Sequence, residues 1–303
     1  MKDLLAIRGL TSEIIESILD RAAYYKTSLD SGNKCFDKLK GKLVITLFYE
    51  NSTRTRTSFE SAAKYLGAEV VNISVASSSV QKGETLKDTA ITLDAMKADA
   101  IIVRHSLAGT ADAIAGWVDA HVINGGDGLH AHPTQALLDA FTIKEKFGYT
   151  KGLKAAIIGD IKHSRVARSN IYLMRTLGID VNIYGPATLM PQGIDKLPCR
   201  VCGSMEEAVK DCNVVMTLRI QAERMKGGLL PALGEYSKVF GIDSKLLQGA
   251  ADDVMVMHPG PVNRGVELSY DVLDTDICYK DKQVTSGLAV RMALLDMLIG
   301  GEL

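Results

Sequence analysis

A run of hydroxyl and guanidinium side chains, Ser52-Thr53-Arg54-Thr55-Arg56-Thr57-Ser58, follows an apolar segment at residues 44–48. The apolar segment predicts a buried strand, and helical spacing of apolar residues resumes after Ser58 and ends at Gly67. Anions bind at a helix N-terminus because its backbone N–H groups are unpaired and its dipole is positive there. Since guanidinium groups match phosphate oxygens in bidentate geometry, the loop predicts a phosphate site. The alternative is an ordinary capped helix with solvated arginines, since strand–turn–helix units are common.

Basic or hydrogen-bonding residues also follow most of the other apolar segments that predict strands. These residues are Arg104-His105, His130-Ala131-His132-Pro133-Thr134-Gln135, Arg165, Arg219-Ile220-Gln221 and His258-Pro259-Gly260-Pro261. In open α/β sheets, ligands bind beyond the carboxyl ends of the strands, so the expected fold brings such residues together. A single arginine after a strand is usually a solvated loop charge. Several cations at the same kind of position instead predict a cleft for two anions. They are Arg54, Arg104, Arg165 and Arg219, with Lys82 in a polar loop before Gly83.

The segments that would position these residues alternate between helical and strand patterns, which predicts α/β architecture with parallel sheets. The expected strands are residues 43–49, 70–73, 100–103, 122–124, 155–158, 181–184, 214–217 and 255–257. The expected helices are residues 11–26, 55–66, 85–96, 133–147, 164–177, 204–211 and 286–299.

The sequence predicts a domain boundary at the segment Gly148 to Gly152. It predicts one domain at 1–148, a second at 149–285 and a C-terminal helix at 286–303 that packs back on the first domain. We therefore expect two similar-sized α/β domains, each with a central, mainly parallel sheet flanked by helices. Small-molecule sites often lie at domain interfaces, so the active site is expected in the cleft between them.

Composition excludes several classes of protein. A chain of 303 residues suggests two domains at roughly 150 residues each. The net charge of −1 argues against a general nucleic-acid binder. No apolar stretch approaches the roughly 18 residues of a membrane span, and residues 1–8 are too short and charged for a signal peptide. These features predict a cytoplasmic protein that binds neither nucleic acid nor membrane.

The cysteines and several common catalytic motifs give no alternative site. The five cysteines are scattered, which suits a reducing compartment. Cys199 and Cys202 form a Cys-x-x-Cys pair, but no second ligand pair supports zinc, so ordinary thiols are favoured over a redox role. His130 and His132 lack a third ligand at metal spacing, and His130 is interpreted as a loop residue. No phosphate-binding P-loop, dinucleotide Gly-x-Gly-x-x-Gly or Gly-x-Ser-x-Gly elbow is present.

Five ordered motifs that span essentially the whole chain resemble the aspartate/ornithine carbamoyltransferase family. They are Ser52-Thr53-Arg54-Thr55-Arg56, Lys82-Gly83-Glu84, His132-Pro133-Thr134-Gln135, Arg219-Ile220-Gln221 (with Arg165 before it) and His258-Pro259-Gly260-Pro261. Ornithine-type members typically carry Cys in the His-Pro motif and a His-Cys-Leu-Pro segment near the end. Here Thr134 and Gly260 replace those features, which favours aspartate as the acceptor.

The resemblance implies that the amine of L-aspartate attacks the carbonyl carbon of carbamoyl phosphate, a step of pyrimidine synthesis that needs no cofactor or metal. By the same resemblance, the catalytic residues are Arg54, Thr55, Lys82, Arg104 and His132. Those expected to bind carbamoyl phosphate are Ser52, Thr53, Arg54, Thr55, Ser78, Arg104, His132, Gln135, Gly260 and Pro261. Those expected to bind aspartate are Lys82, Arg165, Arg219 and Gln221.

The resemblance further implies a homotrimer in which Ser78 and Lys82 reach into a neighbouring subunit's site. Association with regulatory chains or other pathway enzymes stays open. So do two other functions: a carbamoyltransferase for another amino acid such as ornithine, and a non-catalytic anion-binding paralogue.

Overall fold

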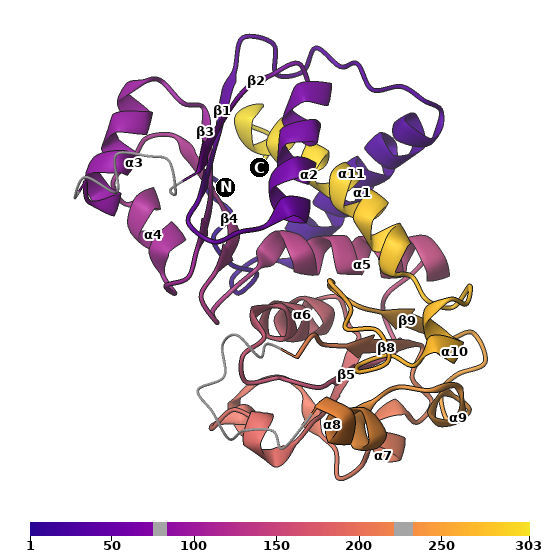
Figure 1. Cartoon of the computed structure of the whole chain (residues 1–303). Helices are drawn as coiled ribbons and strands as arrows, with labels where there is room; N and C mark the ends of the chain where they lie inside the picture. The colour runs from indigo at the N-terminus through magenta and orange to yellow at the C-terminus, as the bar shows by residue number, and fades with distance from the viewer. Residues whose placement is uncertain (75–83, 221–232) are drawn as a thin grey trace. The chain divides into compact units, whose positions relative to one another are not determined.

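The computed structural model describes residues 1–74, 84–220 and 233–303 (Figure 1). Residue contacts divide these into two units: unit 1 is Met1–Phe141 with Val284–Leu303, and unit 2 is Thr142–Gln283. Each unit has its own parallel sheet, of four strands in unit 1 and five in unit 2, flanked by helices. The prediction of two α/β domains with parallel sheets is therefore confirmed.

The sheet of unit 1 has the strand order β2-β1-β3-β4, and every pairing is parallel. Its strands are β1 (Leu43–Phe48), β2 (Glu69–Ser74), β3 (Ala100–His105) and β4 (His121–Asp127). β1 and β3 are central, and they are apolar along most of their length because both faces are covered.

Helices cover both faces of this sheet. They are α1 (Ser12–Asp30), α2 (Thr53–Tyr65), α3 (Leu86–Ala95), α4 (Thr110–Ala115), α5 (Pro133–Phe147) and α11 (Lys280–Ile299). α3 and α4 lie on one face, where Leu93 and Ile114 join the core with alternate strand residues such as Ile101. α2 and α11 lie on the other face (Figure 1). α5 continues into unit 2, because the units divide after Phe141.

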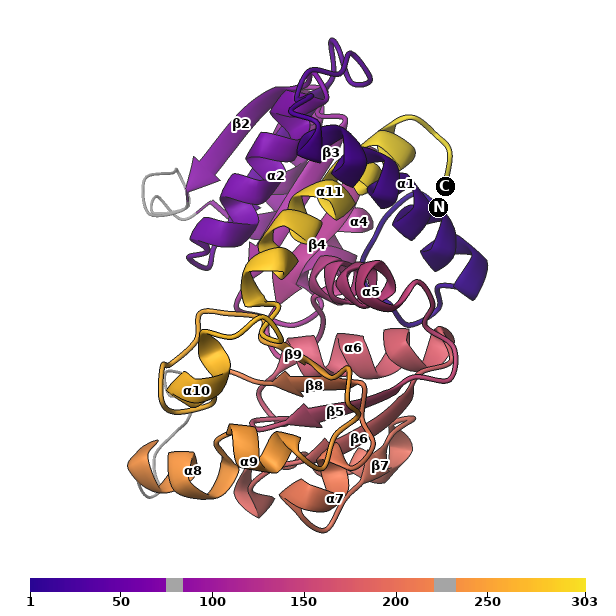
Figure 2. The ribbon, with the colours of Figure 1, turned by 90° about the vertical axis from the view of Figure 1, so that its right-hand side faces the viewer.

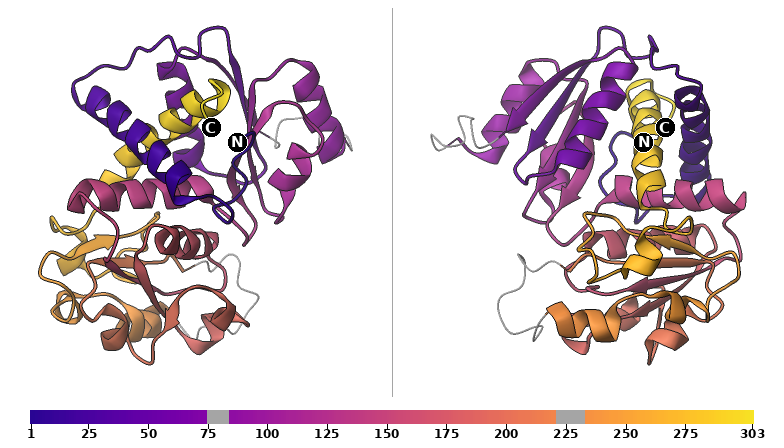
Figure 3. Two further views of the ribbon diagram at one scale, coloured as in Figure 1. Left: turned by 180° about the vertical axis from the view of Figure 1, so that it is seen from behind. Right: turned by 45° about the vertical axis from the view of Figure 1, so that its right-hand side comes forward.

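The C-terminal helix α11 is tied to two helices from the beginning of the chain. Tyr25 of α1 donates its hydroxyl to Asp296 of α11 at 2.7 Å, and the two helices run side by side (Figure 3). α2 lies beside α11 (Figure 2), and Arg291 of α11 donates from Nη1 to the Ser58 hydroxyl of α2 at 2.9 Å. Residues from Val284 onward are thus part of unit 1 although they come last in the sequence.

The sheet of unit 2 has the order β7-β6-β5-β8-β9, again all parallel. Its strands are β5 (Lys154–Ile158), β6 (Asp180–Tyr184), β7 (Arg200–Val201), β8 (Val214–Thr217) and β9 (Met255–Met257). Its helices are α6 (Arg165–Thr176), α7 (Met205–Val209), α8 (Leu233–Phe240), α9 (Ser244–Leu247), α10 (Tyr270–Leu273) and the 3₁₀ turns η3 (Ala187–Leu189) and η4 (Ile194–Lys196). α6 packs on one face, and α7, α9 and α10 contribute to the core on the other (Figure 2).

Element boundaries differ from the sequence-based expectation mainly at helix ends. The first helix is capped by the Thr11 side chain as expected, but it extends to Asp30. The last helix begins at Lys280 and not at residue 286. Gln283 can lie in its first turn, although buried, because its Oε1 accepts the backbone N–H of His258 at 3.0 Å. Within the described ranges, no helix is both long and apolar enough to span a bilayer.

Candidate active site

The loop after β1 ends in the N-terminus of α2, as the sequence predicts. Ser52 is the N-cap, and its Oγ accepts the backbone N–H of Thr55 at 3.4 Å. Thr55 is buried, whereas Thr53 and Arg54 are exposed, and the first turn contains no acidic residue. The first N–H groups of the helix have no intrahelical acceptor, so this turn can bind an anion through backbone and side chain together.

Arg104 is the second-last residue of β3, on the strand next to the one that leads into this loop. β1 and β3 are neighbouring strands with Phe48 opposite Arg104, and Tyr49 donates its backbone N–H to the Arg104 carbonyl at 2.8 Å. Among the contacts of the guanidinium, Nη1 donates to the Gly125 carbonyl at 3.0 Å, and Nε pairs with Glu50 at 3.4 Å. These contacts fix the direction of Arg104 before any ligand arrives.

His132 completes the group in unit 1. It is buried, immediately precedes α5, and its Nε2 lies 3.4 Å from Nη1 of Arg104. Because a guanidinium only donates, Nε2 accepts in this contact, and a neutral His132 ring then carries its proton on Nδ1. The structure therefore brings Arg104 and His132 together, and it sets the Ser52 loop at the end of the adjacent strand.

Asp127, at the end of β4, is a residue whose role the sequence did not reveal. Its buried carboxylate accepts N–H groups of Gly109 at 2.6 Å and Ala131 at 3.1 Å, and the Asn124 amide at 2.8 Å. It also pairs with His130 at 3.0 Å. This network shapes the loop that presents His132. In the sequence, Asp127 is recognisable only as an acidic residue that follows a predicted strand.

Asp127 also belongs to a cluster of potential metal ligands. Oxygen and nitrogen atoms of Asp112, Asp127 and His130 lie within 4.8 Å of one another. Both oxygens of Asp127 already accept hydrogen bonds from the protein, one from Ala131 and the other from Gly109. We therefore assign no metal to this cluster and interpret His130 as part of the loop.

Gln135 lies in the first turn of α5, one turn after His132. Its backbone N–H donates to the His132 carbonyl at 3.1 Å. Its side-chain Nε2 donates to the buried carboxylate of Asp139 at 2.9 Å. The amide of Gln135 is thus anchored by a partner that the sequence analysis did not identify.

In unit 2, the two arginines predicted to bind aspartate follow neighbouring strands. β5 and β8 pair with Ile158 opposite Thr217. Arg165 begins α6 behind the Ser164 cap and is buried, and Arg219 follows β8 and is partly exposed. A buried pair, His163 Nδ1 with Asp160 at 2.9 Å, orders the loop that leads to Arg165.

The segment after β9 contains Gly260 and Pro261, joined by a cis peptide bond. The N–H of Gly260 donates to Nδ1 of His258 at 2.7 Å. Fully buried Glu267 accepts the N–H of Ile220 at 2.9 Å and that of Asn263 at 2.8 Å. Burial raises the pKa of Glu267, while these N–H groups oppose the shift. Glu267 therefore ties the segment after β8 to the segment after β9.

Glu267→Gln is expected to destabilise the protein by about 1 to 3 kcal/mol, because one accepting oxygen becomes an NH₂ group that faces an N–H donor. Denaturant unfolding of both proteins measures the difference. Glu206→Gln is the control, since Glu206 is exposed. An unfolding free energy unchanged by Glu267→Gln would contradict the role of this carboxylate.

Three predicted site residues, Ser78, Lys82 and Gln221, lie outside the described residues. Their expected contacts stay predictions.

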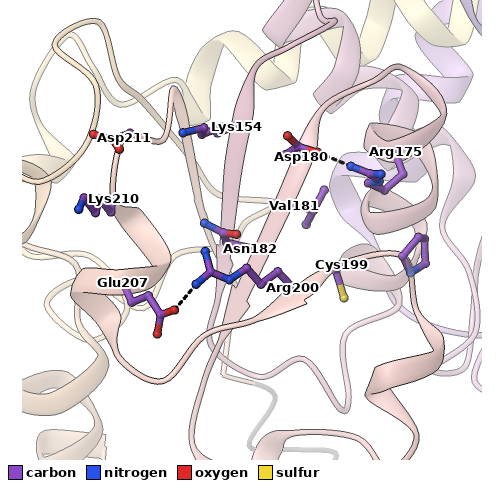
Figure 4. Close-up of a pocket in the computed structure, with 11 residues that line it drawn as sticks. Lys154, Arg175, Asp180, Val181, Asn182, Cys199, Arg200, Glu207, Lys210 and Asp211 are labelled. Atoms are coloured by element: carbon purple, nitrogen blue, oxygen red, sulfur yellow. Dashed lines mark hydrogen bonds and ion pairs between the residues drawn. The ribbon is translucent and has the colours of Figure 1, made fainter.

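A pocket of about 720 Å³ in unit 2 contains none of the predicted site residues (Figure 4). Its lining includes Lys154, Asp180 and Arg200, which begin β5, β6 and β7. It therefore lies at the amino ends of the strands, whereas ligands of such sheets bind at the carboxyl ends. We do not assign the transfer chemistry to it.

Cys199, which also lines this pocket, and Cys202 are both free thiols. Burial raises the pKa of Cys199 to about 11, and burial also raises that of Cys202. Because the thiolate is the reactive form, these two residues are poor nucleophiles at neutral pH.

Comparison with protein families gives a match over nearly the whole chain. Residues 2–145 match the aspartate/ornithine carbamoyltransferase, carbamoyl-P binding domain, and residues 151–298 match the Asp/Orn binding domain of the same enzymes. The aspartate carbamoyltransferase catalytic subunit of Acetivibrio thermocellus is 58% identical over 98% of this chain and 95% of that protein. The corresponding subunit of Pelotomaculum thermopropionicum is 54% identical over 99% and 97%.

Solved structures with the same fold include both types of enzyme. Aspartate transcarbamoylase of Trypanosoma cruzi, in complex with carbamoyl phosphate and aspartate, is 31% identical, with a TM-score of 0.89 over 97% of this chain and 96% of that chain. Ornithine carbamoyltransferase of Pyrococcus furiosus is 30% identical, with a TM-score of 0.88 over 99% and 97%. The fold alone therefore does not show which amino acid accepts the carbamoyl group. The match of both halves of the chain to the two domain models of these enzymes does establish the family. The chain belongs to the aspartate/ornithine carbamoyltransferase family.

Proposed function

We propose that this protein transfers the carbamoyl group of carbamoyl phosphate to the amine of L-aspartate, and releases N-carbamoyl-L-aspartate and phosphate. The observation that carries the chemistry is an arrangement at the ends of two neighbouring strands. The helix that Ser52 caps follows β1, and Arg104, near the end of the adjacent strand β3, contacts His132. The acceptor is supported by identities of 58% and 54% to two aspartate carbamoyltransferase catalytic subunits over nearly the whole chain. The product makes this a step of pyrimidine synthesis, which we place in the cytoplasm.

Unit 1 is proposed to bind carbamoyl phosphate. The hydroxyls of Ser52 and Thr53, the N–H groups of the first turn of α2 and the guanidinium of Arg54 hold the phosphate. Thr55, Arg104 and His132 surround the carbonyl oxygen. Gln135, with Gly260 and Pro261 from unit 2, orients the carbamoyl NH₂.

In the proposed reaction, the neutral amine nitrogen of aspartate attacks the carbonyl carbon and a C–N bond forms. The carbonyl oxygen becomes an oxyanion, which Arg104 stabilises because its guanidinium is already oriented by Gly125 and Glu50. The C–O bond to phosphate then breaks with its electron pair on phosphate, which also accepts the proton lost by the amine. Arg54 stabilises the leaving charge, so the chemistry calls for no cofactor.

Unit 2 is proposed to bind aspartate, with Arg165 and Arg219 on its two carboxylates and Gln221 and Lys82 assisting. Guanidinium groups suit this task because they donate two parallel hydrogen bonds to a carboxylate.

Arg165→Ala is expected to raise the KM for aspartate by about tenfold or more, since a charge-assisted hydrogen bond contributes about 1.5 to 3 kcal/mol. The KM for carbamoyl phosphate should change little. Steady-state kinetics with each substrate varied in turn measure both constants. Arg175→Ala is the matched control, because Arg175 also lies on α6 but is exposed and pairs with Asp180. An effect confined to carbamoyl phosphate would show that Arg165 has been assigned to the wrong substrate.

The function itself is tested by supplying the purified protein with carbamoyl phosphate and either L-aspartate or L-ornithine. Formation of N-carbamoyl-L-aspartate together with phosphate is the expected result. Turnover with ornithine alone would reassign the acceptor. Tight phosphate binding without any transfer would instead indicate a non-catalytic paralogue.

We further propose that the active form is a homotrimer, in which Ser78 and Lys82 of one subunit complete the site of its neighbour. Mixing Lys82→Ala subunits with Arg54→Ala subunits should then restore activity, because some sites in hybrid trimers receive both intact residues. The measurement compares the mixture with each variant alone after subunit exchange. Exchange demonstrated by mass without any gain in activity would argue against shared sites.

A further inference from the structure

The side-chain amide of Gln135 is held in one orientation by Asp139. Nε2 of Gln135 donates to Oδ1 of Asp139 at 2.9 Å. A carboxylate offers only acceptors, so it binds the NH₂ end of the amide and not its oxygen. Oε1 of Gln135 has no hydrogen bond to another residue in the described part of the chain.

We propose that Asp139 is a positioning residue that makes the site selective for the amino group of carbamoyl phosphate. By holding the NH₂ end of Gln135, Asp139 leaves Oε1 as the atom available to substrate. An accepting oxygen binds a carbamoyl NH₂ but gains no hydrogen bond from the methyl group of an acyl phosphate such as acetyl phosphate. This inference rests on the proposed function, because it assumes that Gln135 faces the carbamoyl group.

The chain stabilises Asp139 as a charged acceptor. Asp139 is fully buried, and a buried carboxylate is retained only when a cation or hydrogen bonds compensate its charge. Arg291 of α11 supplies a positive charge that interacts with Asp139. Burial lowers the pKa of Arg291 to about 10, so it is still a cation at neutral pH.

Arg291 is itself fixed by its surroundings. Its Nη1 donates to Ser58 at 2.9 Å, and its guanidinium lies over the Phe59 ring at 5.1 Å, both on α2. At Gly287 a Cβ atom would lie 2.7 Å from Nη1 of Arg291, so the absent side chain makes room for the guanidinium. The cluster thus links the helix that carries Arg54 to the helix that carries Gln135.

The test uses two unreactive phosphonate analogues, one of carbamoyl phosphate and one of acetyl phosphate. They differ only in the group on the carbonyl carbon. Phosphonoacetamide has NH₂ on the carbonyl carbon, and acetonylphosphonate has CH₃ there. Calorimetric titration of the whole protein gives both dissociation constants without any turnover. We expect the wild type to prefer the amide by about tenfold, the effect of one hydrogen bond. In Asp139→Asn the preference should fall to within about twofold, because asparagine can pair with either end of the Gln135 amide.

A double-mutant cycle separates positioning from general damage. If Asp139 acts through Gln135, then Asp139→Asn added to Gln135→Ala should cause no further loss of preference. Ser58→Ala is the matched control, since it perturbs Arg291 without touching the amide, and it should keep the preference.

The proposal is overturned by a wild type without preference, by equal weakening of both analogues in Asp139→Asn, or by loss of preference in Ser58→Ala. If Asp139→Asn does not fold because Arg291 becomes an unpaired buried cation, Asp139→Asn with Arg291→Gln removes both charges and is judged by the same ratio. Turnover of the wild type with carbamoyl phosphate and aspartate is measured separately, so a failed function and a failed selectivity are distinguishable.

Discussion

Arg54→Ala is expected to lower kcat by about a hundred- to a thousandfold, the usual effect of removing a donor that stabilises charge in the transition state. The reason is that Arg54 is proposed to neutralise phosphate as it leaves, and this charge is greatest after the C–O bond has begun to break. Because the side chain is exposed, the free energy of unfolding should change by less than about 0.5 kcal/mol. Steady-state kinetics and denaturant unfolding measure the two effects.

Lys64→Ala is the matched control for Arg54→Ala, since it removes a cation from the same helix. Lys64 pairs with Glu60 at 2.7 Å on the exposed side, and such surface pairs contribute little. Nearly normal turnover in Arg54→Ala, with the control also normal, would refute the phosphate role.

Arg104→Ala is expected to have an effect of similar size on kcat, with an added loss of stability. The change removes a proposed oxyanion donor, which costs about a hundred- to a thousandfold in rate. It also leaves the Gly125 carbonyl and Glu50 without the guanidinium that contacts them. Rates from single-turnover experiments, together with unfolding curves, separate the two consequences.

Arg104→Lys tests whether charge alone is sufficient at this position. A lysine ammonium is a compact point charge and cannot reproduce the planar set of donors that reaches Gly125, Glu50 and His132 together. We therefore expect Arg104→Lys to recover less than about a tenth of the lost rate. Full recovery in Arg104→Lys would mean that the fixed geometry of the guanidinium is unimportant.

Much of the fold could be predicted because the sequence patterns that specify its helices and strands lie within short segments. The apolar strands of both sheets and the caps at Thr11, Ser52 and Ser164 depend on neighbours within a few residues. The position of Arg104 also followed, since the carboxyl ends of parallel strands meet at one edge of a sheet.

The residues that support the site could not be predicted in the same way. Asp127 and Glu267 resemble any other acidic residue of a strand end or loop, and their roles depend on groups that folding brings close. Asp127 accepts an N–H from Gly109, and Glu267 accepts one from Ile220. Those partners are far away in the sequence, so no spacing rule reveals them. Short elements such as α4 and β7 were not predicted, because they contain too few residues to show a helical or strand periodicity.

The acceptor amino acid is a question of side chains and not of fold. Enzymes for aspartate and for ornithine match this backbone almost equally, with TM-scores of 0.89 and 0.88. The side chains proposed to bind the acceptor, such as Arg165 and Arg219, are therefore the targets in an attempt to alter it.

The assignment of α11 from Val284 onward to unit 1 has a consequence for biosynthesis. Leu294 and Leu295 of this helix are fully buried, so the N-terminal part of unit 1 lacks part of its interior until the residues from Val284 onward have been translated. While the ribosome synthesises unit 2, the part of unit 1 that has already been made exposes apolar surface that α11 later covers. A nascent chain stopped after Phe141 would accordingly be a substrate for chaperones and proteases, and not an independently stable module.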